Sequence, residues 1–308
     1  MGKATRAAYG ETLIELAREG LDVVAIDADL SGSTTTAKFG AEYPDRFFNA
    51  GIAEANMTGV AAGLAKEGKI AFTGSFAVFG TGRAWEQIRN TVCANNLDVK
   101  IAPTHAGVTV GPDGGSHQAL EDITIMRVLP NMRVIVPADH ASAKAAIRLA
   151  AQTSGPFYIR LGRMDAVDVY EEGFELELGR AYVLREGSDV TIAACGIEVD
   201  QALKAAELLE TEGVQAEVID VVSVKPLDVE TILASVRKTG RIVTCEEHSV
   251  LGGMGSAISE VLSEIYPVPT RRIGIVDTFG QSGDPHDLIE HYRLDSASIA
   301  AAARELLI

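Results

Sequence analysis

The chain has 308 residues, of which 47% are hydrophobic and 23% charged, so it is long enough for two domains and is not of disordered composition. Lys and Arg number 27 against 43 Asp and Glu, and the net charge of -16 argues against a nucleic-acid or an anionic membrane surface. The three cysteines form no Cys-x-x-Cys pair, which argues against a disulfide framework or a cysteine zinc site and fits a reducing cytoplasm. The N-terminus has no signal-peptide apolar core and no run of about 18 apolar residues occurs, so we expect a cytoplasmic protein.

The first half of the chain alternates short β-branched runs with Ala- and Leu-rich amphipathic stretches, which is the pattern of an α/β domain. Its predicted strands are Asp22–Asp27, Lys69–Gly74, Val99–Pro103, Arg133–Pro137 and Phe157–Leu161. Its predicted helices are Thr5–Arg18, Ala53–Lys66, Gly82–Ala94, His117–Val128 and Ala138–Ala151. Because the strands are nearly continuous apolar runs, we expect a parallel sheet that helices cover on both faces.

An acidic stretch without a clear period, Asp165–Glu177, interrupts this alternation and is interpreted as a linker. The predicted strands after it are Val190–Ala194, Ala216–Val221, Arg241–Cys245 and Arg271–Val276, and the predicted helices are Glu198–Glu212, Val229–Lys238, Ser256–Ile265 and Ser296–Leu307. We therefore predict two consecutive α/β domains, each with a mostly parallel sheet flanked by helices. They comprise residues 1–165 and 181–308, with the linker at 166–180.

The segment Gly51–Asn56 combines an acidic residue with the start of a helix that is almost bare of polar side chains. Glu54 falls in the first turn, where the helix dipole favours a charged carboxylate. A lone glutamate at such a position is most often only a dipole-stabilising surface residue. Here the apolar composition predicts a buried helix, and a buried carboxylate needs a partner, which a ligand can supply.

A second segment, Ser75–Arg83, follows directly on a predicted strand, and the carboxyl ends of parallel strands are where ligands of such sheets gather. Phe76 and Phe79 lie three residues apart in a loop with two glycines, so they are suited to stack on a flat heterocycle. The alternative is that both rings fill the core, as phenylalanine most often does.

The most informative segment is the long loop Thr104–Gln118, which holds four glycines, two of the six histidines and Asp113. Long loops of a compact domain are usually functional or disordered, and the predicted strand and helix beside this one argue against disorder. His105 and His117 are suited to exchange protons with sugar hydroxyls or, when charged, to bind phosphate. A zinc site is disfavoured because neither an HExxH pattern nor cysteines accompany the histidines.

Two further motifs remain. Arg160 and Arg163 end the last strand of the first half, where an arginine can bind phosphate through two hydrogen bonds, although a surface salt bridge is at least as common a role. The stretch Glu246–Ala257 follows a strand and opens a helix, but its glycines do not fit the spacing of a dinucleotide-binding loop. We interpret these glycines as positions of close backbone packing.

Together these segments resemble the C-terminal half of transketolase, namely its thiamine-diphosphate pyrimidine-binding domain followed by its small C-terminal domain. Phe48–Glu54 resembles the family segment with the glutamate that activates thiamine diphosphate, and Ser75–Phe79 resembles the aromatic patch beneath the aminopyrimidine. Thr104–His105 and Gly111–Gln118 resemble the loop that contacts the sugar phosphate. The resemblance covers essentially the whole chain, and this last loop is its most specific part.

The resemblance implies a set of site residues: Glu54, His105 and His117 as catalytic residues, Glu54, Ile52, Phe76, Phe79 and Asp29 at the cofactor, and Arg6, Ser33, His105, Asp113, His117 and Arg163 at the substrate. It implies no metal ligand in this chain. Glu54 would contact N1′ of the aminopyrimidine, while the two histidines would bind the hydroxyls of a ketose donor and move protons during cleavage of its C2–C3 bond. Arg6, Arg163 and Ser33 would hold the distal phosphate. Because the net charge is -16, we expect the two arginines and the two histidines to concentrate the cations of the site.

Two departures from the family pattern stand out. Gly82 occupies the place of a third aromatic residue of many full-length relatives, which predicts a different cofactor clamp. The pyrophosphate domain with its Gly-Asp-Gly motif is absent, and neither Gly283–Pro285 nor Pro112–Gly114 replaces that motif. We therefore expect a separately encoded N-terminal transketolase subunit that holds most of the thiamine diphosphate and its Mg²⁺ or Ca²⁺, in an α2β2 assembly.

The resemblance predicts a transketolase subunit that transfers a two-carbon ketol unit between sugar phosphates, as in the pentose phosphate pathway, and leaves the preferred sugar open. A fragment similar to 1-deoxyxylulose-5-phosphate synthase is one alternative, although that family usually has another residue at the place of His105. A 2-oxo acid dehydrogenase β subunit is a second alternative, but its acyl chemistry needs no paired histidines for ketose hydroxyls. A non-catalytic partner subunit is the third, which the retention of Glu54, His105 and His117 together disfavours.

Overall fold

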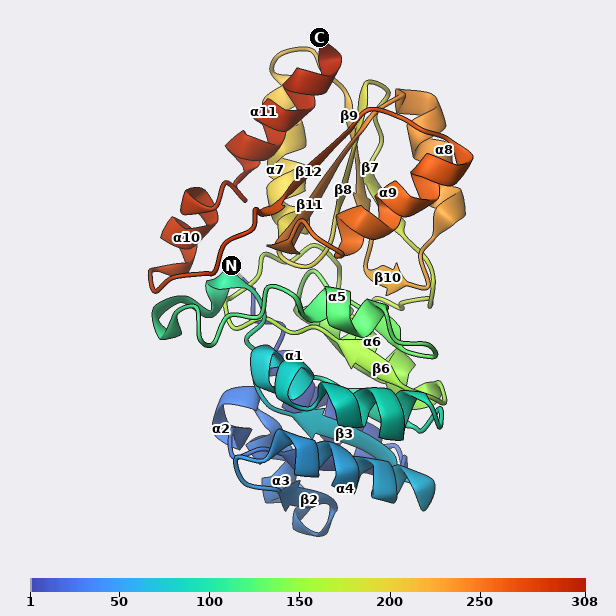
Figure 1. Cartoon of the computed structure of the whole chain (residues 1–308), viewed down its shortest axis with the longest axis vertical. Helices are drawn as coiled ribbons and strands as arrows, with labels where there is room; N and C mark the ends of the chain where they lie inside the picture. Colours follow the sequence, from blue (N-terminus) through green and yellow to red (C-terminus); the bar gives the residue numbers. More distant parts are fainter. Residues whose placement is uncertain (1) are drawn as a thin grey trace.

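Two parallel-rich sheets, each covered by helices, form the two halves of the molecule (Figure 1). The structure, a computed structural model, describes residues 2–308. In spatial order, the strands of the first sheet are β10 (Ser223–Lys225), β5 (Arg133–Ile135), β6 (Phe157–Ile159), β4 (Val99–Ile101), β3 (Ile70–Gly74), β1 (Val23–Asp27) and β2 (Phe47–Asn49). Neighbouring strands of this sheet run parallel except β10 and β5, which are antiparallel.

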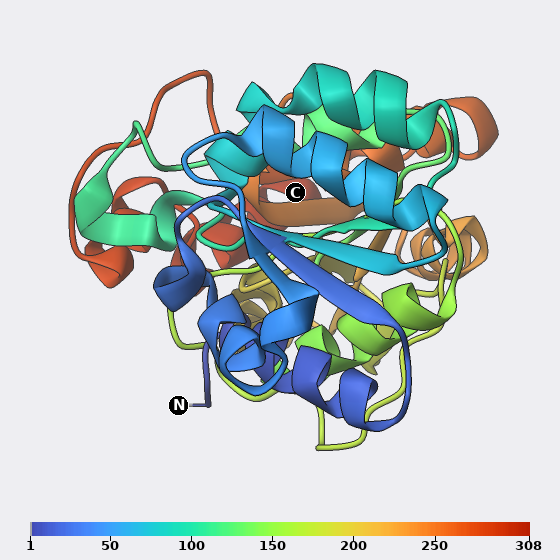
Figure 2. The ribbon, with the colours of Figure 1, turned by 90° about the horizontal axis from the view of Figure 1, so that it is seen from below.

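Helices cover both faces of the first sheet (Figure 2). Successive residues of β1 point to opposite faces, so Val23 and Ala25 join one hydrophobic cluster while Val24 and Ile26 join the other. The helices of this half are α1 (Ala7–Arg18), α2 (Ser31–Thr34), α3 (Thr36–Glu42), α4 (Glu54–Lys66), α5 (Asp122–Arg127) and α6 (His140–Gln152). Burial of both faces explains why the strands are continuous apolar runs in the sequence.

The second sheet has the spatial order β12 (Thr270–Ile275), β11 (Ile242–Ser249), β8 (Val190–Ala194), β9 (Ala216–Asp220) and β7 (Tyr182–Arg185). Its strands are parallel except for the β7–β9 pair. The helices of this half are α7 (Glu198–Glu210), α8 (Val229–Thr239), α9 (Met254–Ile265), α10 (Pro285–His291) and α11 (Ser296–Leu307). The predicted fold class of two α/β units with mostly parallel sheets is confirmed.

The structure adds elements that the sequence did not predict. Strands β2 and β10 have three residues each, and strand β7 and helix α10 are also short, so none of them forms a long periodic run. The predicted helix Gly82–Ala94 contains the π-helical segment η3 (Gln87–Cys93). A second π-helical segment, η2 (Val78–Arg83), lies mostly in the stretch that was predicted as a loop, so that part of the loop prediction is wrong. The predicted helix His117–Val128 is wrong at its start, because residues 117–121 form loop and α5 begins only at Asp122.

Strand β10 belongs to the second half of the sequence but pairs with β5 of the first sheet, where Ser223 lies opposite Ile135. The two halves of the chain are therefore joined through one sheet as well as through the segment 166–180. That segment contains no helix or strand. Phe174, Leu176 and Leu178 pack with the cluster that contains Val23, and Val169 and Tyr170 pack against a cluster of the second half. The limits 1–165, 166–180 and 181–308 stay a prediction.

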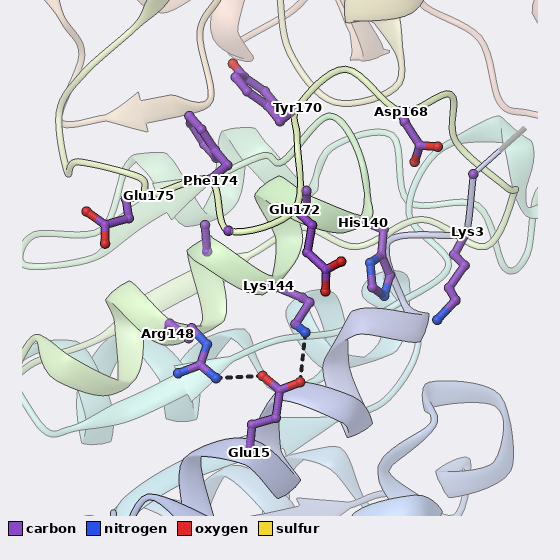
Figure 3. A pocket seen from close by; sticks show the side chains of 14 residues that line it. Lys3, Glu15, His140, Lys144, Arg148, Asp168, Tyr170, Glu172, Phe174 and Glu175 are labelled. Atoms are coloured by element: carbon purple, nitrogen blue, oxygen red, sulfur yellow. Dashed lines mark hydrogen bonds and ion pairs between the residues drawn. The ribbon is translucent and has the colours of Figure 1, made fainter.

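Ion pairs link α1 to α6 beside a cavity of about 760 Å³ (Figure 3). Lys144 Nζ lies 2.7 Å and Arg148 Nη2 2.6 Å from the two carboxylate oxygens of Glu15. Tyr170 and Phe174 of the segment 166–180 also line this cavity, whereas no residue proposed for the active site does. The cavity is thus separate from the site described below. Within residues 2–308, no helix combines the length and the apolar character needed to cross a membrane.

Candidate active site

The residues proposed for the site follow the carboxyl ends of strands of the first sheet. They lie after β1 (Asp29 and Ser33), after β2 (Ile52 and Glu54), after β3 (Phe76 and Phe79), after β4 (His105, Asp113 and His117) and after β6 (Arg163). Because these strands are parallel, all five loops leave the sheet at the same edge. Arg6, the residue immediately before α1, also lies at this edge.

The carboxylate of Glu54 is buried, with 1% of the side chain exposed, at the first residue of α4. Ser75 Oγ donates a hydrogen bond to Glu54 Oε1 at 3.2 Å, and Arg83 Nη1 donates to Glu54 Oε2 at 2.6 Å. The expectation that this carboxylate is buried and paired is confirmed. Its partners in the chain are a hydroxyl and a guanidinium, and half of the Arg83 side chain is exposed.

The expectation that the whole of α4 is buried is wrong. Met57, Ala61 and Ala62 face the core of the first sheet, whereas Gly59 and Val60 on the opposite side are exposed in this chain. The low polarity of the helix predicted burial, but one side of it has no covering layer within residues 2–308.

Four rings form one cluster beside Glu54. Phe76 stacks on the imidazole of His105 with ring centroids 3.8 Å apart and planes 20° from parallel. Phe79 lies 6.3 Å from Phe76 and receives the edge of His117 at 5.2 Å. The sequence predicted a pair of phenylalanines and a pair of histidines in separate loops, and the structure brings the two pairs together.

His105 is uncharged at neutral pH. Burial, together with the positive charges of Arg6 and Arg163, lowers the pKa of His105 from 6.5 to about 3. Arg6 Nη1 lies 3.5 Å from His105 Nε2, and because a guanidinium only donates, Nε2 is the acceptor. The ring proton therefore lies on Nδ1, from which it is donated to Thr104 Oγ1 at 2.7 Å. The expectation that His105 adds a cation to the site is wrong.

Arg6 and Arg163 add positive charge at this edge, as expected from the sequence. Arg6 Nη1 donates to the carbonyl oxygen of Ser33 at 3.0 Å, and burial and the nearby charge of Arg163 lower the pKa of Arg6. Arg163 Nη1 donates to the carbonyl oxygen of Val110 at 2.8 Å and lies 3.3 Å from Asp113 Oδ2. Asp113 therefore partly neutralises Arg163, and Ser33 contacts Arg6 through its backbone.

Asp29 and Ile52 border the site on exposed loops. The side chain of Ile52 is 77% exposed, and Asp29 accepts a hydrogen bond from Asn49 Nδ2 at 3.0 Å. The backbone of Asp29 has a φ of 65°, in the left-handed region. Ile52 lies two residues before Glu54, and Asp29 follows β1, the strand that pairs with β2. Neither residue is part of the ring cluster.

Sequence reasoning missed three residues that shape the site. Ser75 and Arg83 lie in a segment that was singled out for its phenylalanines, and the need of a buried carboxylate for donors was the signal that could have identified them. Asp27, fully buried at the end of β1, accepts hydrogen bonds from the backbone of Leu30 and the hydroxyls of Thr34 and Thr36. Burial raises the pKa of Asp27, and its hydrogen bonds hold the turn that carries Asp29.

Arg160 and the glycine-rich stretch Glu246–Ala257 have structural roles. Arg160 is buried and its Nε lies 2.7 Å from Asp122 Oδ2, so it forms an internal ion pair. In the stretch Glu246–Ala257, the carboxylate of Glu246 accepts hydrogen bonds from the backbone amides of Met254 and Gly255 at the start of α9. A Cβ atom at position 253 would lie 2.1 Å from Glu246 Oε2. The prediction that these glycines allow close packing is confirmed.

The site fits one end of thiamine diphosphate. A buried carboxylate with a half-exposed partner and a set of flat apolar rings are the groups that an aminopyrimidine needs. Within residues 2–308, no three His, Cys, Asp or Glu side chains are arranged to hold a metal ion.

Family models match both halves of the chain. The model of the transketolase pyrimidine-binding domain matches residues 1–167, and that of the transketolase C-terminal domain matches residues 179–299. The chain is 50% identical over 306 residues to a Methanocaldococcus jannaschii protein described as a transketolase C-terminal section, covering 98% of this chain and 96% of that protein. It is 45% identical over 301 residues to a 6-deoxy-6-sulfo-D-fructose transketolase subunit of Clostridium sp., covering 98% and 94%.

A solved structure described as a split-gene transketolase in an inactive β4 tetramer superposes with a TM-score of 0.91 at 51% identity, covering 100% of this chain and 99% of that one. The fold is therefore that of the transketolase pyrimidine-binding and C-terminal domains. The chain belongs to the transketolase family.

We predict that the His105 imidazole does not titrate between pH 5 and pH 8, because burial and two arginines disfavour its charged form. NMR spectra of the chain with ¹³C at the histidine Cε1 atoms would measure this, with His105→Asn to assign the signal. Acidification below the unfolded-state pKa of 6.5 should destabilise the fold, since only the unfolded chain then gains this proton. A His105 signal that titrates near or above pH 6.5 would contradict the prediction.

Proposed function

We propose that the chain is the C-terminal subunit of a thiamine-diphosphate-dependent transketolase that transfers a two-carbon ketol unit between sugar phosphates. The observation that carries this proposal is the buried Glu54 carboxylate beside the cluster of Phe76, Phe79, His105 and His117. A carboxylate, an aromatic surface and paired imidazoles at one sheet edge are the groups that ketol transfer requires from this half of the enzyme. The three buried free cysteines suit a cytoplasmic location.

A separate N-terminal subunit completes the enzyme in this proposal. The sequence carries no Gly-Asp-Gly motif for the diphosphate and its Mg²⁺ or Ca²⁺, so the partner would hold both. The two relatives match this chain over nearly their whole length and are described as a C-terminal section and as a subunit. The solved structure of similar length is described as a split-gene enzyme whose β4 tetramer is inactive. These descriptions support an α2β2 assembly in which this chain is the β subunit.

The exposed Arg83 gives Glu54 a way to change partners. When bound, thiamine diphosphate supplies a nucleophilic carbon and an electron sink for cleavage of the C2–C3 bond of a ketose. Glu54 would hold a proton shared with N1′ of the aminopyrimidine through Oε2, the oxygen that now accepts from Arg83. Because half of the Arg83 side chain is exposed, it can rotate into solvent, while Ser75 continues to donate to Oε1.

The histidines would handle the hydroxyl groups of the donor. The neutral His105 directs the lone pair of Nε2 toward Arg6 Nη1 at 3.5 Å, a long contact that a hydrogen bond from a sugar hydroxyl would replace, and Thr104 fixes the tautomer through Nδ1. The ring of His117 packs against that of Phe79 in a T-shaped arrangement and would exchange protons with a second hydroxyl. Phe76 holds the His105 ring by stacking, which orients Nε2 without a further polar contact.

The two arginines would bind the distal anion of the substrate. In each arginine one guanidinium nitrogen donates to a backbone carbonyl oxygen, and other nitrogens remain for a ligand. Their positive charges also reduce the negative electrostatic potential of the protein at this edge. The Clostridium relative acts, by its description, on a sugar that carries a sulfonate at the end opposite its keto group. Phosphate and sulfonate are both oxyanions that guanidinium groups can bind, so the identity of this anion is a property of the individual subunit.

The reconstituted enzyme tests this function. Mixing the chain with the N-terminal transketolase subunit of the same organism, thiamine diphosphate, Mg²⁺, xylulose 5-phosphate and ribose 5-phosphate should give ketol transfer, and either subunit alone should give none. Glu54→Ala should lower the rate by at least about 100-fold, because the general acid–base step is lost, without changing assembly on a sizing column. Glu42→Ala, which removes an exposed carboxylate of the same unit, is the control. Full activity of the chain alone or of Glu54→Ala would contradict the proposal.

The anion site predicts a selective change in KM. Arg6→Ala should raise the KM for a phosphorylated donor by about 10-fold or more, since a charge-assisted hydrogen bond contributes roughly 1.5–3 kcal/mol. The KM for an unphosphorylated ketose should stay the same, and so should both values in the exposed control Lys38→Ala. An equal change for both donors would assign Arg6 a structural role instead.

A further inference from the structure

We propose that Glu247, a residue of the second half of the chain, is a positioning residue that fixes the loop carrying His105 and His117. This inference rests on the function proposed above, and it gives the C-terminal unit a part in the reaction. Glu247 lies near the end of β11, and its side chain is 3% exposed. It touches neither histidine and would act only through the backbone of the loop.

The first contact is with the beginning of the loop. Glu247 Oε1 accepts a hydrogen bond from the backbone amide of Thr109 at 2.7 Å, between residues 138 positions apart in the sequence. Gly107, two residues after His105, packs directly on the carboxylate, where a Cβ atom would lie 2.1 Å from Glu247 Cδ. With a φ of 80°, Gly107 also has a backbone conformation that disfavours any other residue.

The second contact is with the end of the loop. Arg160 Nη2 donates to the carbonyl oxygen of Glu247 at 2.9 Å and to that of Ala119 at 3.3 Å. The amide of Gly107 donates to the same Ala119 oxygen at 3.0 Å, so the two ends of the loop are joined at this point. Ser249, two residues after Glu247, donates its amide to the carbonyl oxygen of Leu120 at 2.8 Å. Both ends of the loop are therefore tied to the last residues of β11.

The charge of Arg160 is compensated inside the protein. Its Nη1 lies 3.8 Å from Glu247 Oε2, and its Nε lies 2.7 Å from Asp122 Oδ2. Burial alone would lower the pKa of Arg160, but Asp122 and Glu247 raise it overall, so the guanidinium stays charged. Asp122 belongs to the first half of the chain and Glu247 to the second, which makes this buried ion cluster a junction between the two units.

The tip of the loop rests on the second unit as well. Gln118 Nε2 donates to the carbonyl oxygens of Val108 and Gln281 at 2.9 and 3.0 Å. A Cβ atom at Gly115 would lie 2.5 Å from the carbonyl oxygen of Gly280, so the two backbones are in direct contact there. His117 thus lies between a tip held by the segment 280–282 and an end held by β11.

Glu247→Ala and Glu247→Gln in the reconstituted enzyme test the proposal. Glu247→Ala should lower kcat/KM for the ketose donor on the order of 10-fold or more, with a raised KM, because an unpaired buried amide would displace the loop. Glu247→Gln keeps an oxygen that accepts from Thr109 and should restore most of the loss. Leu209→Ala, which destabilises the core of the second unit without touching the loop, is the matched control and should leave both constants unchanged below its unfolding temperature.

A second readout needs no catalysis. The histidine Cε1 spectra of the chain alone should show shifted His105 and His117 signals in Glu247→Ala, and unshifted ones in Leu209→Ala. These spectra test the positioning role independently of catalysis. Absence of ketol transfer in the reconstituted enzyme would overturn the proposed function but not the positioning role. Unchanged histidine signals in Glu247→Ala, or equal kinetic losses in Glu247→Ala and Leu209→Ala, would overturn the positioning role.

Discussion

Parallel pairing of the strands of the first sheet is the constraint on which the site depends. Only because β1, β2, β3, β4 and β6 run in one direction do their following loops meet at one edge. The pairing is maintained by burial of both faces, since alternate residues of β1 and β6 belong to two different hydrophobic clusters. The polar residues of the site lie where these strands end.

The second unit stabilises that edge from outside the sheet. It contributes Glu247 to a buried ion cluster with Arg160 and Asp122 of the first unit, and it contributes a strand, β10, that joins the first sheet. Removal of one member of this cluster would strongly destabilise the fold, because a buried charge left without its partner has no solvent to stabilise it. The two units are in this sense one structure, and the loop with the histidines lies at their junction.

Local sequence was sufficient for the parts of the site that lie within one segment. Glu54 and the phenylalanines could be predicted because strand ends and helix starts are visible in the pattern of apolar residues. The Arg83 contact could not, since it depends on a π-helical segment, Val78–Arg83, in a stretch that was predicted as a loop. The prediction of a positive charge on His105 was wrong because stacking on Phe76 buries the ring. The hydrogen bond between Glu247 and Thr109 joins residues 138 positions apart, and no local pattern in the sequence connects them.

Binding of thiamine diphosphate measures most directly whether this chain is one half of a shared site. Calorimetric titration of thiamine diphosphate with Mg²⁺ should show no saturable binding to the chain alone, because in the proposed enzyme the N-terminal subunit holds the diphosphate and its metal ion. The complex with the N-terminal subunit should bind one cofactor for each pair of subunits. One equivalent bound tightly by the isolated chain would contradict the account.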